Sequence, residues 1–277
     1  MIANARMYSV TPTVAALWRS LLGAILKGVG SSIEIVDHAP PAPIAELWQR
    51  PDKAAVFMCG LPYSLATPQP GMVVAPIPSP EAYAGRPCYW SDIVVRADSP
   101  FRTIEQTFGH RLALTTPESQ SGYAALLHAL MPHGGGAPLY GEIIEPRFTP
   151  MGALTAVIDG KAEVAPLDSY AFALLSKYAP ELTSQVRVIM STEPTAVPLF
   201  VSSGPASPTV AAAFLAAREA PATAALMDQL LLRRFARSEG RAYDDLRGRF
   251  LAMQAFWRRH PLAKTAHPLF AAELGSM

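Results

Sequence analysis

The segment "HRLALTTPESQSGYAALLHAL" (residues 110–130) passes from a strand to a polar turn and then to a helix. Its first apolar run suits a buried strand, and its last suits an apolar helix. In an α/β protein, this order puts the turn at the carboxyl end of a strand and at a helix N-terminus. Two interpretations stay open. Ser119 or Ser121 caps the helix, or the donors of the turn bind an anion.

The alternation of strand and helix patterns continues on both sides of this segment. Apolar runs at 31–38, 54–60 and 162–168 predict strands, and residues 11–30 predict a helix. Thr11 is a suitable N-cap for that helix, and Pro12 suits its first position. We therefore expect an α/β fold.

Two further segments give testable expectations for the fold. Residues 71–79, "GMVVAPIPS", form a strand pattern that is too rich in proline for the centre of a sheet. Residues 207–220, 223–237 and 242–260 predict three consecutive helices.

The domain organisation is predicted from two long extended segments, residues 88–97 and 186–201. They bracket a block with its own strand and helix alternation. We expect two lobes, one made of residues 1–94 plus 190–277 and the other of residues 95–189. The two extended segments would act as hinge strands, and a ligand would bind between the lobes near helix N-termini.

Composition excludes several classes of function. The formal net charge of the 277 residues is +1, and the arginines near the C-terminus alternate with acidic residues, so nucleic acid is not an expected partner. No run approaches the ~18 apolar residues of a membrane span. The chain has no phosphate-binding loop, dinucleotide fingerprint or metal motif, and Cys59 and Cys88 have no metal-type spacing. We expect no cofactor.

The order of several segments resembles the phosphate and phosphonate substrate-binding proteins of ABC transporters, which have the type II periplasmic-binding-protein fold. The resemblance runs from about residue 3 to about residue 218, through "AAVFMCGLPYSLA" and "TPMGALTAVIDGKAEVAPLDSYAFALL". Most of it lies in "YWSDIVVRADSPFRTIEQTFGHRLALTTPESQSGY", which ends in a Ser-x-Ser-Gly turn. The family commonly has Gly-Ser-His where this chain reads "TPMG".

The resemblance implies a set of ligand-binding residues. Three tyrosines lie in or just after strands and offer an aromatic wall and a phenol donor. For each tyrosine, and for Tyr123, packing in the core is the alternative, and Gln120 either donates its amide or faces solvent. The full set comprises Tyr8, Tyr63, Tyr89, Ser119, Gln120, Ser121, Gly122, Tyr123 and Asp168.

Asp168, in "APLDSY", has two interpretations. In the family, a carboxylate here can accept a proton from a protonated phosphoryl oxygen. The alternative is that Asp168 caps the helix that begins at Ser169.

The resemblance implies a binding protein without turnover, which takes up a phosphate-like or phosphonate-like oxyanion for an ABC transporter permease. It also implies a periplasmic location, although "MIANARMYSVTP" has no signal-peptide pattern. A cytoplasmic enzyme or a small-molecule sensor on the same fold is the alternative.

Overall fold

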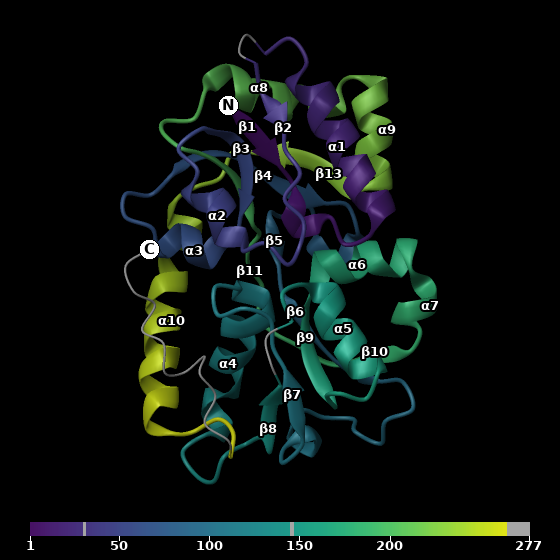
Figure 1. Cartoon of the computed structure of the whole chain (residues 1–277), viewed down its shortest axis with the longest axis vertical. Helices are drawn as coiled ribbons and strands as arrows, with labels where there is room; N and C mark the ends of the chain where they lie inside the picture. Colours follow the sequence, from purple (N-terminus) through teal and green to yellow (C-terminus); the bar gives the residue numbers. More distant parts are fainter. Residues whose placement is uncertain (30–31, 145–146, 265–277) are drawn as a thin grey trace. The chain divides into compact units, whose positions relative to one another are not determined.

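The computed structural model describes residues 1–29, 32–144 and 147–264 of a mixed α/β chain (Figure 1). The chain divides into two compact units. The first unit is Met1–Tyr89 with Thr195–Tyr243, and the second is Trp90–Pro194 with the chain from Asp244 onward. The first two crossings between units fall inside the two extended segments that the sequence suggested as hinge strands.

The first unit is built on a six-stranded sheet with the order β13-β4-β12-β3-β1-β2. β1 pairs in parallel with β2 and β3, whereas β12 is antiparallel to β3 and β4. The strands are β1 (Ile2–Asn4), β2 (Glu34–Ile35), β3 (Lys53–Met58), β4 (Gly71–Pro78), β12 (Leu199–Ser202) and β13 (Leu232–Ala236). The helices are α1 (Pro12–Leu26), α2 (Ile44–Gln49), α3 (Gly60–Leu65), α8 (Pro208–Leu215) and α9 (Pro221–Gln229).

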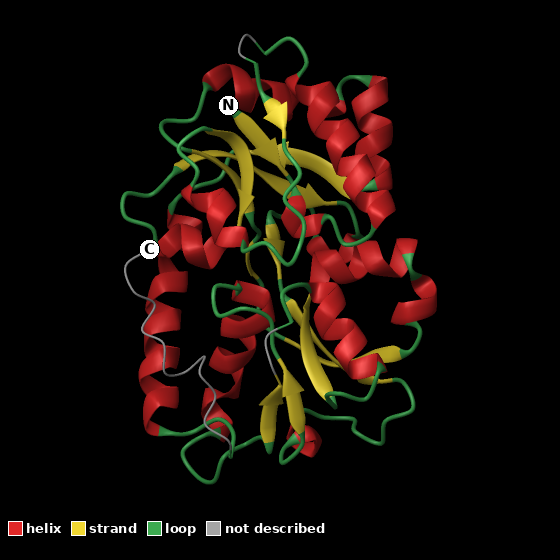
Figure 2. Cartoon of the chain, in the orientation of Figure 1, coloured by secondary structure: helices red, strands yellow, loops and turns green. Residues whose placement is uncertain are grey.

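Helix α1 forms as the sequence predicted. Thr11 accepts a hydrogen bond from the backbone N–H of Val14, and Pro12 is the first helical residue. α1 packs against α8 and α9 beside the sheet (Figure 2). Its buried Trp18 lies edge-on to Phe57 of β3, whose ring stacks on Phe200 of β12 with centroids 3.8 Å apart. These aromatic contacts fix the core of the first unit.

Two expectations for the first unit were wrong. β4 lies inside the sheet, because β12 pairs with its proline-free half up to Val74, whereas Pro76 and Pro78 face β13 across an irregular register. The second expected C-terminal helix stops at Gln229, and residues 232–236 form β13. β13 is an edge strand with exposed Arg233 and Arg234, which discourage pairing with another chain.

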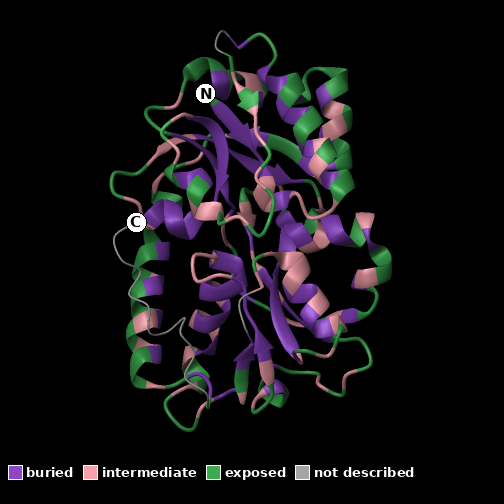
Figure 3. Cartoon of the chain, in the orientation of Figure 1, coloured by how far each residue is buried: buried purple, intermediate pink, exposed green. Residues whose placement is uncertain are grey.

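The second unit contains a five-stranded sheet with the order β10-β6-β9-β7-β8. β7 is parallel to β8 and β9, and β6 is antiparallel to β9 and β10. The strands are β6 (Ser91–Arg96), β7 (Arg111–Ala113), β8 (Glu142–Ile144), β9 (Val164–Asp168) and β10 (Val186–Ser191). The helices are α4 (Ala125–Leu130), α5 (Pro150–Ile158), α6 (Ser169–Tyr178), α7 (Pro180–Thr183) and most of α10 (Arg241–Arg259). Figure 3 shows that the strands of both sheets are largely buried.

Helix α10 groups with the second unit, whereas the sequence-based division placed it in the first lobe. The indole N–H of Trp257 donates to the carbonyl of Leu127, 2.9 Å away, and both residues are buried. Gly134 lies directly against Phe256 and Trp257. This packing is a long-range contact that the helix pattern of residues 242–260 does not specify.

The segments at the unit border are extended but interrupted. β5 (Cys88–Tyr89) pairs with β11 (Thr195–Ala196) in a small two-stranded sheet within the first unit, and β6 starts at Ser91, after the single intervening residue Trp90. In the described ranges no single helix is long and apolar enough to cross a membrane, and only the bent pair Pro208–Arg218 and Pro221–Gln229 passes that test together.

Candidate functional site

Three helices of the second unit begin at the same edge of its sheet. β7, β8 and β9 run in parallel, so their carboxyl ends share that edge (Figures 1 and 2). A helical turn at Gln120 follows β7, α5 follows β8, and α6 follows β9 directly. Each helix start presents backbone N–H donors and a partial positive charge, so the edge favours an anion.

The Ser119–Gly122 turn is a π-helical start rather than an ordinary α-helical one. Residues Gln120–Ala124 form one π turn, in which the N–H of Ala124 donates to the carbonyl of Ser119, 3.0 Å away. The Oγ of Ser119 accepts from the N–H of Gly122 at 2.9 Å. Ser119 is therefore the N-cap, and a hydroxyl that accepts in this way keeps its O–H as a donor. A π turn is rare and often occurs at functional sites.

Gly122 is required by packing. A Cβ on this residue would lie 2.0 Å from Oγ1 of Thr115, and the N–H of Thr115 donates to the carbonyl of Gly122 at 3.0 Å. Thr115 is only 6% exposed, and its hydroxyl has no hydrogen-bond partner among the described residues. A buried hydroxyl without a partner carries a desolvation cost, which a ligand oxygen in this turn would remove.

Ser121 connects the turn to two strands. Its Oγ donates to Oδ2 of Asp168 at 3.3 Å, and its carbonyl accepts from Oγ of Ser91 at 2.7 Å. Oδ1 of Asp168 accepts from the N–H groups of Tyr170 and Ala171, each 2.9 Å away. The capping role of Asp168 is thus present, and its carboxylate also holds the Ser-x-Ser-Gly turn against the end of β9.

Gln120 and Tyr123 are both buried, with exposed fractions of 5% and 3%. Gln120 therefore does not face solvent, which removes one of its two interpretations. Burial raises the pKa of the Tyr123 phenol well above its ordinary value. Tyr123 consequently stays protonated at physiological pH and keeps its O–H donor.

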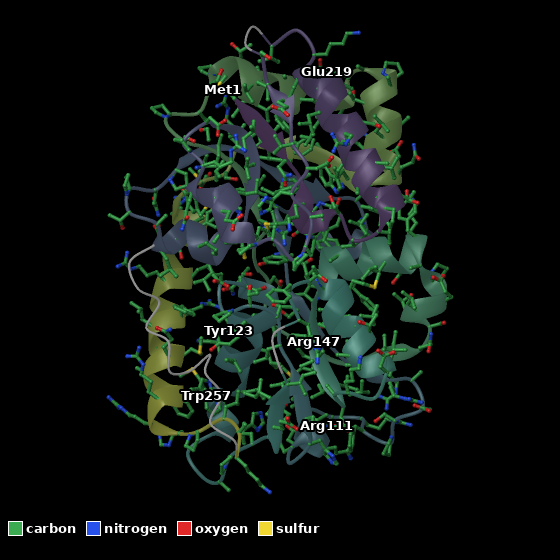
Figure 4. The ribbon with its side chains drawn as sticks, in the orientation of Figure 1. Met1, Arg111, Tyr123, Arg147, Glu219 and Trp257 are labelled. Carbon is green, nitrogen blue, oxygen red and sulfur yellow. The ribbon has the colours of Figure 1, made fainter. Side chains whose placement is uncertain are left out.

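Arg147 also belongs to this edge, although it is not among the residues predicted from the sequence. Its backbone N–H donates to the carbonyl of Leu114, 2.9 Å away, just beyond the end of β7. Thr149 then caps α5 by accepting from the N–H of Gly152 at 3.0 Å. A basic residue two positions before a capping threonine and Pro150 was the available signal. Figure 4 labels Arg147 and Tyr123 at the end of the second unit to which β7 and β8 point.

The three candidate tyrosines lie in the first unit, each at most 3% exposed. Tyr8 follows β1 and lies edge-on to Phe57, and Tyr63 in α3 lies edge-on to Tyr243 with centroids 5.2 Å apart. The phenol oxygen of Tyr89 is 3.9 Å from Sγ of Cys59, and the N–H of Tyr63 donates to the Cys59 carbonyl. Cys59 therefore links Tyr63 and Tyr89, and Cys59 and Cys88 do not form a disulfide.

No group of three or more His, Cys, Asp or Glu side chains that could hold a metal ion occurs in the part of the chain that the structure describes. The donors gathered in the second unit are hydroxyls, backbone N–H groups and a guanidinium. This donor set suits an oxyanion.

Comparison with known proteins agrees with this chemistry. Residues 12–243 match a family of periplasmic substrate-binding proteins of phosphonate ABC transporters. The sequence matches no curated protein. The family match confirms the resemblance seen in the sequence. It also supports a binding protein over an enzyme, because the family consists of substrate-binding proteins.

Solved structures with low sequence identity share the fold. A binding-protein component of an ABC phosphonate transporter from Pseudomonas aeruginosa has a TM-score of 0.77 and 16% identity, with 99% of this chain and 92% of that chain covered. A binding protein from Prochlorococcus marinus in complex with methylphosphonate has a TM-score of 0.72 and 15% identity, with 94% and 97% covered. A chloride-bound protein from Xanthomonas citri has a TM-score of 0.66 and 17% identity, with 94% and 99% covered. These similarities confirm the expected two-domain periplasmic-binding-protein fold.

Proposed function

This chain belongs to the family of periplasmic substrate-binding proteins of phosphonate ABC transporters, and on that basis we propose that it captures a small phosphonate or phosphate-like oxyanion. A methylphosphonate complex of a protein with the same fold supports this class of ligand. The protein binds its ligand and releases it unchanged to a transporter.

The observation that best supports the proposal is the convergence of three helix starts at one edge of the second sheet. Backbone N–H groups at the starts of the π turn, α5 and α6 lie at the carboxyl ends of β7, β8 and β9. The Ser119 hydroxyl and the buried Thr115 hydroxyl add donors at the first of these starts, and Ser121 would add another by turning its O–H from Asp168 to the anion. Several charge-assisted hydrogen bonds to one anion would explain this concentration of donors.

Eight of the nine residues proposed from the sequence keep their roles here as a hypothesis, and Asp168 takes a different one. The donors from Ser119 to Tyr123 contact the oxyanion, and Asp168 orients Ser121. Tyr8, Tyr63 and Tyr89 provide an aromatic wall for the organic part of the ligand. We further propose that the protein works in the periplasm and delivers the ligand to an ABC transporter permease.

Isothermal titration calorimetry with the full chain tests the proposed ligand class. We expect exothermic binding of methylphosphonate, phosphite or phosphate, and no heat with a neutral sugar or a zwitterionic amino acid. The proposal is wrong if no phosphorus oxyanion binds while a neutral metabolite does.

A further inference from the structure

The position of Arg147 in the second unit is fixed by two elements. Its N–H donates to the carbonyl of Leu114, and the next residue, Thr115, donates to the carbonyl of Gly122 in the π turn. Cβ of Arg147 lies 3.4 Å from where a Cβ on Gly152 would be, in the first turn of α5. The side chain of Arg147 therefore leaves the backbone beside two helix starts, those of the π turn and of α5.

The side chain of Arg147 is only partly exposed, and part of its guanidinium is buried. Its Nε is inaccessible to solvent and has no hydrogen-bond partner among the described residues. Within those residues no carboxylate lies within ion-pair distance of Arg147, whereas Arg111 pairs with Glu163 and Arg96 pairs with Asp98. A buried N–H on a charged group costs free energy unless an acceptor reaches it. Arg147 thus differs from the paired arginines of its own unit.

The buried carboxylate at this edge has several donors of its own. Oδ1 of Asp168 accepts from two backbone N–H groups, and Oδ2 accepts from Ser121. On the donor side, the nearly fully buried hydroxyl of Thr115 faces the first turn of the helix at Gly122 and has no partner in the described ranges. The edge therefore has an excess of donors over acceptors, which suits a ligand with several negatively charged oxygens.

We propose that Arg147 is a ligand-binding residue that selects a doubly ionised phosphorus oxyanion over singly charged anions of the same shape. The proposal rests on the proposed function. When the ligand binds, the guanidinium would turn so that its parallel Nε–H and one Nη–H donate to two oxygens of one tetrahedral anion. The helix starts and hydroxyls bind the remaining oxygens. A second negative charge strengthens the interaction with the full positive charge of Arg147 more than that with neutral donors.

Calorimetry with methylphosphonate and methanesulfonate, which share a tetrahedral shape, tests this inference. For the wild type, we expect methylphosphonate to bind more tightly, with an affinity that rises as pH increases through its second ionisation. Arg147→Gln should weaken methylphosphonate binding by roughly tenfold to a hundredfold and flatten this pH dependence, because bonds to a charged donor are lost. Arg147→Lys should lie between, because it keeps the charge but lacks the fork.

The matched control is Arg247→Gln, which removes the same charge from an exposed position on α10. We expect it to bind methylphosphonate within about twofold of the wild type, because salt screens an exposed charge. The inference is overturned if Arg147→Gln and Arg147→Lys keep wild-type affinity and pH dependence. If Arg147→Gln does not fold, Arg147→Lys alone tests the inference, and wild-type affinity and pH dependence in that variant would overturn it. If the wild type binds no phosphorus oxyanion, the proposed function fails first, and this inference fails with it.

Discussion

The two units carry different kinds of side chain at the carboxyl ends of their parallel strands. In the first unit, β1 and β3 lead to tyrosines that pack against other aromatic rings, as Tyr8 does on Phe57. In the second unit, β7, β8 and β9 lead to hydroxyls, helix starts and an arginine. The first edge is therefore mainly aromatic, and the second is mainly a set of hydrogen-bond donors.

The arginines near these edges show the difference most directly. Arg6 follows β1, and its Nη1 donates to the carbonyl of Ala42. Arg147 follows β8, and its buried Nε has no partner among the described residues. An arginine that bonds a carbonyl stabilises its own loop, whereas one held without an acceptor is available to a ligand. This difference leads to the prediction that charge recognition belongs to the second unit.

The largest expected effect concerns the packing of the π turn. Gly122→Ala should lower the free energy of unfolding by about 3 kcal/mol, because its Cβ would overlap the Thr115 side chain. Chemical denaturation monitored by circular dichroism measures this loss. Gly248→Ala is the control, since nothing lies near its added Cβ in α10. It should raise the free energy of unfolding by at most about 1 kcal/mol. Equal stability of the two variants would contradict the packing role of Gly122.

The tyrosines of the first unit should matter less for affinity than the donors of the second. Tyr63→Phe and Tyr89→Phe each remove one neutral O–H, so we expect each to weaken methylphosphonate binding by at most about tenfold. The control is Tyr83→Phe, at another buried tyrosine of the first unit, which should leave affinity unchanged. A hundredfold loss of methylphosphonate affinity in Tyr63→Phe or Tyr89→Phe would contradict the assignment of charge recognition to the second unit.

The Arg111–Glu163 pair lies at the opposite ends of the strands and should affect stability alone. Burial pushes the pKa of Glu163 up, but bonds from the Arg111 side chain and backbone hold it below its ordinary value. The pair therefore stabilises the fold above the unfolded pKa, and that contribution disappears as pH falls through the lower folded value.

Replacement of Glu163 tests this acid dependence. Glu163→Gln should lower the free energy of unfolding by about 1 kcal/mol at neutral pH. The difference in stability between this variant and the wild type should disappear in acid. Thermal melts between neutral and acidic pH measure the gap, and methylphosphonate affinity should stay at the wild-type value. A gap that persists in acid would show that Glu163 acts through packing rather than through its charge.

The smallest expected effect concerns Asp92 at the start of β6. Desolvation raises the pKa of Asp92, although Ser191 and the indole of Trp90 donate to its Oδ1. The neutral, protonated form of Asp92 stabilises the fold relative to the charged form. This contribution is complete below the ordinary pKa of an aspartate and is lost as pH rises through the pKa of Asp92 in the folded state. Asp92→Asn keeps the accepting oxygen and should gain up to about 1 kcal/mol at neutral pH, as measured by denaturation. Asp245→Asn, at an exposed residue, is the control, and an equal gain there would contradict the role of burial.

The sequence predicted the parts of the fold that depend on local patterns. The cap at Thr11, the buried strand at residues 53–58 and the turn after β7 all follow from short-range periodicity and capping. β13 was mistaken for a helix, because "LLLRRFA" has no strict alternation and its strand state depends on pairing with β4. The interior position of β4 also depends on long-range pairing, because β12 pairs with the proline-free first half of β4 and β13 pairs with the second half.

The candidate site was predictable only where adjacent residues of one segment form it. Ser119, Ser121 and Gly122 are adjacent in the sequence, so their shared turn was visible. Arg147 reaches the same edge through the pairing of β7 with β8 and a bond to Leu114, which a single sequence does not encode locally. The π turn was also not visible in the sequence, which showed only that a helix begins near Ser119.

The central claim is that the Ser119–Gly122 turn binds the oxyanion and does more than cap a helix. The most direct measurement is the affinity for methylphosphonate and the melting temperature of the same Ser119→Ala/Ser121→Ala double variant. We predict that affinity falls by roughly a hundredfold or more, at ~1.5–3 kcal/mol for each bond to a charged ligand, while stability falls by about 1 kcal/mol. A lower melting temperature with unchanged methylphosphonate affinity would contradict the account, because the turn would then be only a cap.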